Sequence, residues 1–121
     1  MTDYSGNDPL GPSAFLGEVL NELAKTIDAR AGADPSSSWT AKLLAGGPPM
    51  TAKKLGEEGV EAALAVMAQG DKEVAGEAAD LVYHLLVALR SRGVSLDTVA
   101  AELKKRQGKS GIEEKTSRGQ P

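Results

Sequence analysis

The sequence predicts an all-α protein: a bundle of four to five helices built around a central antiparallel helix hairpin. Alanine and leucine supply most of the apolar residues, whereas aromatic residues make up only 3% of the 121-residue chain. A β-sandwich would be enriched in β-branched and aromatic residues, so this composition favours closely packed helices. Clusters of glycine and proline separate the stretches of helical periodicity and mark where we expect helices to end.

The chain is expected to form one small domain over residues 13–107. Residues 1–12 are rich in glycine, proline, aspartate and serine, so we expect them to form a flexible leader. Residues 108–121 are expected to form a charged C-terminal tail. A domain of this size buries a modest core, so association with a second copy would help to stabilise it.

The first two helices are predicted from their N-caps. Ser13 can cap a helix that runs to about residue 31. Ser38 can cap a short helix through Trp39 and Leu43. The first helix places four apolar residues on one stripe, namely Leu16, Leu20, Leu23 and Ile27.

The Gly-Gly-Pro-Pro run at residues 46–49 is expected to break the chain before a third helix, at about residues 51–69. A fourth helix is predicted over about residues 71–92, and Gly93 ends it. A last helix follows its own N-cap, Ser95.

The fourth helix carries apolar residues around more of its circumference than one partner helix would cover. We expect it to bury Val74, Ala78, Leu81, Val82, Leu85 and Leu89. Leu86 and Val87 widen this apolar arc, and a second protomer could cover the excess.

The third and fourth helices are expected to form an antiparallel hairpin, because Gly70 stops one helix and Asp71 starts the next. Each of them carries an acidic motif: EExxE at residues 57–61 and ExxD at residues 77–80. Residues at the same height in such a pair have numbers that add to a constant value. The level pairs are Glu58 with Asp80, Glu61 with Glu77 and, one turn further from the reversal, Lys54 with His84.

This hairpin would bring four carboxylates together, those of Glu58, Glu61, Glu77 and Asp80. Carboxylates that lie close together raise one another's pKa unless a cation neutralises them. Ligation by oxygen atoms alone favours Mg²⁺, or Mn²⁺, over zinc, and proteins usually share Mg²⁺ with substrate phosphates. The four acids are therefore predicted to bind a divalent metal that serves phosphate chemistry.

The charged residues allow other interpretations. The acids could decorate solvated helix faces and pair with nearby lysines. A ferritin-type di-iron site needs Glu-x-x-His pairs, and it is excluded because the only histidine has Leu81 three residues before it. His84 could act as a general base, a phosphate ligand or a partly buried hydrogen-bonding group. The cations of the tail, Lys115 and Arg118 among them, could grip phosphate or form a charged terminus.

Composition excludes several classes of protein. A net charge of −3 disfavours nucleic-acid binding. The chain has no cysteine, which rules out disulfides, thiolate zinc sites and cysteine nucleophiles and fits the reducing cytoplasm. No run approaches the roughly 18 apolar residues that a membrane span needs, and the N-terminus lacks the basic start and apolar run of a signal peptide. We expect a cytoplasmic protein.

Three segments resemble one family of enzymes: KKLGEEGVEAALA, EAADLVYHLLVAL and GVSLDTVAAELKKRQGKSGIEEKTSR. They are similar to phosphoribosyl-ATP pyrophosphohydrolase, and the resemblance runs from about residue 16 to residue 118. This family lies within the MazG-type all-α nucleoside triphosphate pyrophosphohydrolases, whose EExxE and ExxD motifs bind Mg²⁺. The resemblance implies Mg²⁺-dependent hydrolysis of phosphoribosyl-ATP to phosphoribosyl-AMP and pyrophosphate, the second step of histidine biosynthesis, by a homodimer.

The resemblance also implies roles for individual residues. The family's metal ligands fall on Glu58, Glu61, Glu77 and Asp80. Its remaining motif acid falls on Glu57, to which we assign water activation or support of the ligands. The residues expected to contact substrate are Lys53, Lys54, His84, Lys115 and Arg118. Trp39 departs from the family, because a tyrosine is frequent at that position.

Two rival functions follow from the same residues. A house-cleaning pyrophosphohydrolase acting on dUTP, dCTP or damaged nucleotides would use the same four acids with a different base pocket. A non-catalytic helical adaptor would keep the bundle and use its apolar face for a partner. Only the adaptor predicts that changing Glu61 to glutamine leaves function intact.

Overall fold

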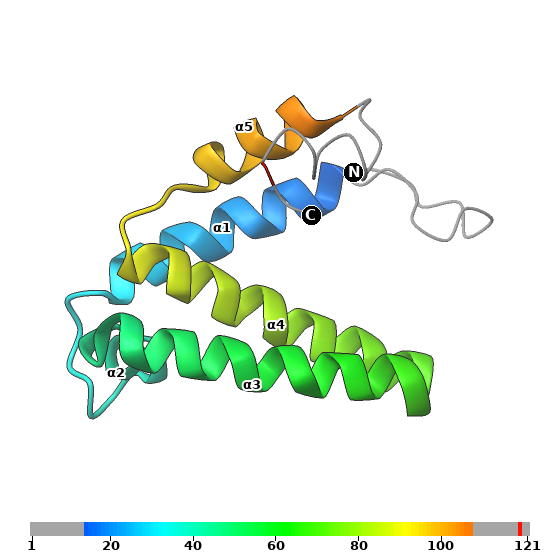
Figure 1. Ribbon diagram of the computed structural model, residues 1–121. Coiled ribbons are helices and arrows are strands. Elements are labelled where there is room, and N and C mark those ends of the chain that lie inside the picture. The colour runs from blue at the N-terminus through cyan, green and yellow to red at the C-terminus, as the bar shows by residue number, and fades with distance from the viewer. Residues whose placement is uncertain (1–13, 108–118, 120–121) are drawn as a thin grey trace.

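The computed structural model describes residues 14–107 and residue 119, and it confirms the all-α prediction. The described part contains five helices and no strand: α1 (Ala14–Arg30), α2 (Trp39–Ala45), α3 (Gly47–Ala68), α4 (Asp71–Ser91) and α5 (Leu96–Arg106) (Figure 1). The predicted N-cap Ser13, the leader over residues 1–12 and all of the tail except residue 119 lie outside the described residues.

Helices α3 and α4 form the predicted antiparallel hairpin and pack against each other more extensively than any other pair of described helices (Figure 1). The chain reverses at Gln69 and Gly70, whose backbones are extended. Gly70 precedes the first turn of α4, and that turn carries Asp71 and Glu73. Negative charges at this end of a helix interact favourably with its dipole, which helps to start α4 directly after the reversal.

The second helix stops at Gly46, as predicted, but the predicted start of the third helix at about residue 51 was wrong. Helix α2 ends at Ala45 and α3 begins at Gly47, so the two prolines lie within the first turn of α3. Proline is tolerated there because the first amide groups of a helix have no acceptor within the helix. Gly47 has a φ of +69°, which is the left-handed conformation that lets α2 end and α3 begin within two residues.

Three other helix ends agree with the predictions. The hydroxyl of Ser38 accepts a hydrogen bond from the Ala41 amide, at 3.1 Å, and caps α2. Ser95 caps α5 in the same way, at 3.1 Å from the Thr98 amide. Gly93, with a φ of +68°, follows α4 and donates its amide to the Arg90 carbonyl at 3.0 Å. This is the glycine stop that ends many helices.

The core lies where α1, α2 and α4 meet. Its buried side chains are Ile27, Leu43, Leu86 and Val87. Two hydrogen bonds between side-chain hydroxyl groups connect the neighbouring helices. Thr40 bonds to Tyr83 at 2.6 Å, and Thr51 bonds to Ser91 at 2.8 Å. Both pairs connect α4 to the α2–α3 segment, so they fix where α4 lies against it.

The prediction for the buried side of α4 was partly wrong. Leu86 and Val87 are the buried apolar residues, whereas Leu85 is 39% exposed and Ala78 is exposed. Leu16 of the α1 stripe is also exposed. The helical period locates an apolar arc, but the docking of α1 and α2 decides which part of that arc is covered.

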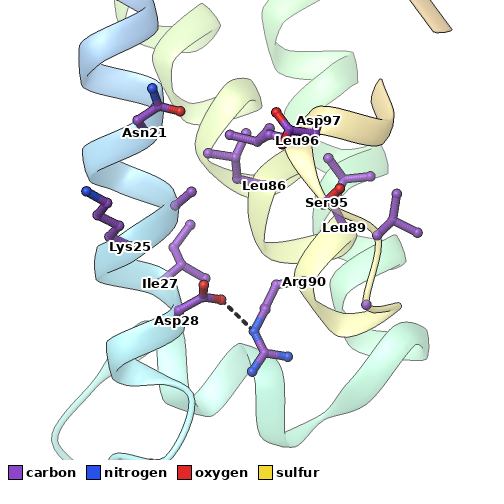
Figure 2. A pocket seen from close by; sticks show the side chains of 13 residues that line it. Asn21, Lys25, Ile27, Asp28, Leu86, Leu89, Arg90, Ser95, Leu96 and Asp97 are labelled. Atoms are coloured by element: carbon purple, nitrogen blue, oxygen red, sulfur yellow. Dashed lines mark hydrogen bonds and ion pairs between the residues drawn. The ribbon is translucent and has the colours of Figure 1, made fainter. Parts of the chain in front are cut away.

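A cavity of about 650 Å³ separates α1 from the end of α4 and the start of α5 (Figure 2). Arg90 crosses one side of it and donates its Nε–H to Asp28 at 2.7 Å (Figure 2). Its lining combines apolar residues, such as Ile27 and Leu86, with polar and charged ones. None of the predicted site residues in the described part of the chain lines this cavity.

Over the described residues, no helix has the length and apolar character needed to cross a bilayer.

Candidate active site

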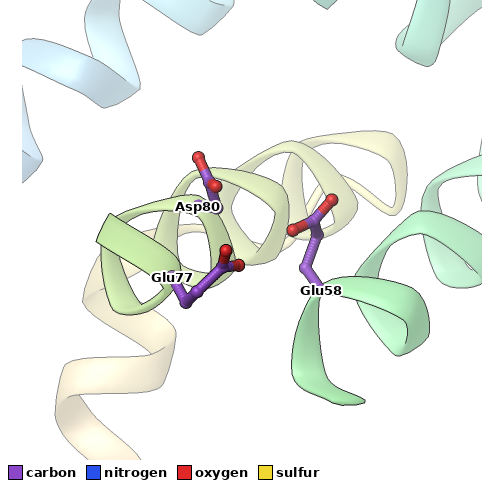
Figure 3. Close-up of side chains that lie close together, drawn as sticks. All are labelled: Glu58, Glu77 and Asp80. Atoms are coloured by element: carbon purple, nitrogen blue, oxygen red, sulfur yellow. The ribbon is translucent and has the colours of Figure 1, made fainter. Parts of the chain in front are cut away.

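Three acids from the two motifs come together on one side of the α3–α4 hairpin. Glu58 projects from α3 toward Glu77 and Asp80 of α4 (Figure 3). Each offers a carboxylate oxygen, and these oxygens all lie within 4.8 Å of one another. Glu58 and Glu77 are half-buried and Asp80 is exposed, so the group opens to solvent on one side. The antiparallel pairing of the helices brings the two motifs level, as the residue numbering predicts.

The surroundings of this acidic group disfavour its negative charge. Burial raises the pKa of Glu58 above its usual value, and the charges of Glu61 and Asp80 add to this effect, while His84 opposes it. Burial likewise raises the pKa of Glu77, and the charges of Glu61, Asp80 and Glu58 add to it. Raised carboxylate pKa values of this origin mean that a nearby cation would stabilise the ionised site.

Two buried polar atoms beside the group have no hydrogen-bond partner among the described residues: Oε2 of Glu77 and Nε2 of His84. A buried carboxylate oxygen without a donor is costly, because it has lost water and gained nothing in return. The donor set consists of carboxylate oxygens, which suit a hard divalent ion. The acidic group can therefore bind a divalent metal ion.

Glu61 lies beside this group and is exposed. Its negative charge contributes to the raised pKa of both Glu58 and Glu77, which places its carboxylate near theirs. Glu61 does not belong to the set of oxygens that lie within 4.8 Å of one another. A glutamate side chain has three rotatable bonds, so a change of rotamer could carry its carboxylate to a metal held by the other three. Its part as a ligand stays a prediction.

The lysines and the arginine predicted to contact substrate differ in what the structure shows of them. Lys54 contacts Glu57, with Nζ 3.7 Å from Oε2, and its ammonium also lies 5.9 Å from the centre of the Trp39 ring. Lys53 is exposed. Lys115 and Arg118 lie outside the described residues. Lys54 is therefore the predicted cation that the structure places in contact with the EExxE motif, through an ion pair with Glu57.

His84 is buried, with 8% of its surface exposed. Its Nδ1 lies 2.8 Å from the backbone carbonyl oxygen of Asp80. A carbonyl only accepts, so Nδ1 carries the proton in this contact. The imidazole also meets the ring of Tyr83 edge-on, with centroids 4.9 Å apart. His84 thus supports the helix turn that carries Asp80, and a direct contact with substrate stays a prediction.

Comparison with known proteins identifies the family. The sequence model described as "Phosphoribosyl-ATP pyrophosphohydrolase" matches residues 20–107, a span that contains both acidic motifs. The chain belongs to the phosphoribosyl-ATP pyrophosphohydrolase family. The predicted resemblance is thereby confirmed.

Individual relatives match almost over their whole length. Proteins named phosphoribosyl-ATP pyrophosphatase from Cereibacter sphaeroides and Caulobacter vibrioides are each 56% identical, over 84% and 88% of this chain and 98% of their own. A third, from Ruegeria pomeroyi, is 54% identical over 83% of this chain and 95% of its own. The matches to these members of the phosphoribosyl-ATP pyrophosphohydrolase family thus cover at least 95% of each relative.

Sequence reasoning missed the surroundings of Trp39 in this member of the family. Lys42 lies with its ammonium 5.8 Å from the ring centre, so two lysines approach one indole. The spacing of Trp39 and Lys42 along α2 could have indicated their proximity. The approach of Lys54 depends on how α3 packs against α2, which no local pattern reveals.

Proposed function

We propose that this protein hydrolyses phosphoribosyl-ATP to phosphoribosyl-AMP and pyrophosphate, the second step of L-histidine biosynthesis. Membership of the family supports this activity, as do relatives above 50% identity that are named phosphoribosyl-ATP pyrophosphatase. The observation that carries it is the meeting of Glu58, Glu77 and Asp80 on one hairpin, because a triphosphate is cleaved by a site that neutralises its charge.

The site fits Mg²⁺, with Mn²⁺ as the alternative. Its carboxylate oxygens are hard ligands, and Oε2 of Glu77 lacks a hydrogen-bond donor among the described residues, a deficit that a bound cation would make good. We assign the metal ligands to Glu58, Glu61, Glu77 and Asp80. When bound, the ion neutralises phosphate charge and makes the attacking water more acidic.

The side chains around the ligands hold and orient the reactants. Lys54 carries a positive charge beside the acids and can contact a phosphate oxygen, and its ammonium lies 3.7 Å from the Glu57 carboxylate. We assign Glu57 a supporting role or activation of the water. His84 donates to the Asp80 carbonyl and so fixes the turn that bears this acid. Lys53, His84, Lys115 and Arg118 complete the proposed set of substrate contacts.

We assign the protein to the cytoplasm as a homodimer. Helix α3 exposes a stripe of three apolar residues, Val60, Leu64 and Met67, whose exposed fractions are 60%, 59% and 84%. They recur at the spacing of one helix face, on a different side from Glu58. A second copy that packs on this face would remove the stripe from water, in keeping with the modest core of one chain.

The rival house-cleaning pyrophosphohydrolase shares the acids and differs in substrate. A direct test measures pyrophosphate release from phosphoribosyl-ATP, dUTP and ATP, with Mg²⁺ and with a chelator. We expect release from phosphoribosyl-ATP alone, and none with chelator. A preference for dUTP would assign the protein to nucleotide sanitation.

Variants separate both enzymes from the adaptor. Glu61→Gln should lose nearly all pyrophosphate release while keeping its helical content. Glu22→Gln makes the same change at an exposed acid of α1 and should retain wild-type rates. Absence of release by the wild type with every substrate would favour the adaptor.

A further inference from the structure

Trp39 is the only tryptophan of the chain, and 48% of its surface is exposed. It stands at the first position of α2, beside a cavity of about 580 Å³. The cavity is lined by residues 35–39 and by Lys42. A partly exposed indole at the edge of a cavity offers a flat apolar surface. Planar aromatic ligands stack on surfaces of this kind.

The backbone that carries this indole is fixed on both sides of Trp39. Its neighbour Ser38 is buried and caps α2, with its hydroxyl 3.1 Å from the Ala41 amide. Its other neighbour, Thr40, is buried and shares a hydrogen bond of 2.6 Å with the hydroxyl of Tyr83 on α4. Tyr83 precedes His84, so α2 is fastened to the part of α4 that carries the acidic site. The backbone of Trp39 is thus anchored to the helix that carries Glu77 and Asp80, as a rigidly supported binding residue requires.

Of the two lysines near the Trp39 ring, Lys54 also contacts the EExxE motif. The ammonium of Lys54 lies 5.9 Å from the centre of the Trp39 ring and 3.7 Å from the Glu57 carboxylate. Glu57 directly precedes Glu58, one of the three clustered acids. The order in space is therefore aromatic ring, cation, acidic site. In a nucleotide the planar base lies at one end and the negatively charged phosphates at the other, so a base on the ring would direct the phosphates toward the cation and the acids.

We propose that Trp39 binds the purine base of the substrate by stacking, with the base in the cavity of residues 35–39 and Lys42. This inference rests on the proposed function, because it takes the acidic site to act on the phosphates of the same nucleotide. The cavity is lined by one ammonium group and otherwise by uncharged side chains, so it suits a base better than a phosphate. Lys54 then faces the phosphates between the base and the acids.

Fluorescence of the wild-type protein tests the stacking directly, because Trp39 is its only tryptophan. AMP, UMP, ribose 5-phosphate and pyrophosphate would each be titrated in the presence of a chelator. We expect saturable quenching by AMP, weaker quenching by UMP and none by ribose 5-phosphate or pyrophosphate at the same concentrations. Equal quenching by pyrophosphate would show that the cavity binds phosphate, and absence of quenching by AMP would also overturn the proposal.

Kinetics of two variants give an independent readout. Trp39→Phe keeps an aromatic face, and we expect its KM for phosphoribosyl-ATP to stay within about threefold of wild type. Trp39→Leu removes the face and should raise KM about tenfold or more with kcat nearly unchanged. Phe15→Leu makes a similar change at an exposed aromatic residue of α1 and should leave KM unaltered. A Trp39→Leu enzyme with wild-type KM would contradict stacking.

Failure of the stacking and failure of the proposed function give different results. Quenching by AMP does not depend on turnover, so it can be seen even if phosphoribosyl-ATP is not hydrolysed. Turnover of phosphoribosyl-ATP without quenching by AMP would keep the proposed function and remove Trp39 from it. Circular dichroism of Trp39→Leu separates a loss of binding from a loss of the fold.

Discussion

His84 donates its Nδ1–H to the backbone carbonyl of Asp80, one helical turn earlier, at 2.8 Å. This contact leaves Nε2 as the free nitrogen of a buried ring, without a partner among the described residues. His84 also lowers the pKa of Glu58, which places the ring beside the α3 side of the acidic group. One imidazole therefore donates a hydrogen bond to the backbone of α4 and lies close to Glu58 of α3.

Replacing His84 should weaken the site without removing its ligands. His84→Ala leaves the Asp80 turn unsupported and opens space beside Glu58, and residues behind metal ligands typically contribute about 10–100-fold to metal affinity or activity. We expect a loss of pyrophosphate release in that range, partly recovered at high Mg²⁺ concentration. An activity that higher Mg²⁺ does not recover at all would argue for a direct role of the ring in catalysis.

Glu77→Gln should have opposite effects on activity and on the stability of the metal-free protein. It removes a ligand, so we expect a loss of pyrophosphate release of about 100-fold or more. It also removes one of several clustered negative charges, which raise the pKa of Glu77 and Glu58. The variant should therefore unfold at a higher temperature than wild type in chelator. Thermal unfolding followed by circular dichroism measures this, and a lower midpoint would contradict the repulsion.

The raised pKa values of Glu58 and Glu77 predict how the stability of the metal-free protein depends on pH. In the folded state both groups hold protons above the ordinary carboxylate pKa of 4.5, at which they titrate in the unfolded chain. Their contribution to stability is thus fully present below pH 4.5 and is lost as the pH rises through the raised values.

Unfolding in chelator across this window provides the measurement. We expect the stability of wild type relative to a Glu58→Gln, Glu77→Gln double variant to fall as the pH rises. Using the difference between the two proteins cancels other groups, including Asp34, whose pKa a hydrogen bond from the Ser36 amide lowers. Parallel curves for the two proteins would refute the prediction.

Two serine caps should differ in their effect on global stability. Ser38 caps α2, which contributes the fully buried Leu43 to the core, whereas α5, capped by Ser95, has no buried residue. Loss of an N-cap typically costs about 1 kcal/mol. We expect Ser38→Ala to lower the free energy of unfolding by about that amount, and Ser95→Ala to raise hydrogen exchange in α5 with little global change. Equal losses would show that α5 belongs to the cooperative core.

The sequence predicted that Glu58, Glu77 and Asp80 lie close together, because the hairpin depends on local rules. A stop at Gly70 and a fixed rise per residue are enough to bring Glu58 opposite Asp80. The sequence did not predict features that depend on how the helices pack against one another. The apolar arc of α4 includes both Leu85 and Val87, and only the positions of α1 and α2 make Val87 buried and Leu85 exposed. Proximity of Lys54 to Trp39 has the same tertiary origin.

If the exposed stripe of α3 forms the dimer interface, one charged residue introduced into it should dissociate the proposed dimer. Leu64 lies between Val60 and Met67 on this stripe, and all three are mostly exposed in one chain. A glutamate buried at an interface without a partner is strongly unfavourable, so Leu64→Glu should shift the protein from dimer to monomer. Size-exclusion chromatography with light scattering measures the mass.

Val66→Glu provides the matched control for this change. Val66 is 68% exposed on the same helix, but two residues along the chain from Leu64, which turns it to another side of α3. It carries the same substitution at a similar exposure, so it should leave the mass of the dimer unchanged. A monomeric wild type, or a dimer disrupted only by Val66→Glu, would show that the stripe of Val60, Leu64 and Met67 is not the interface.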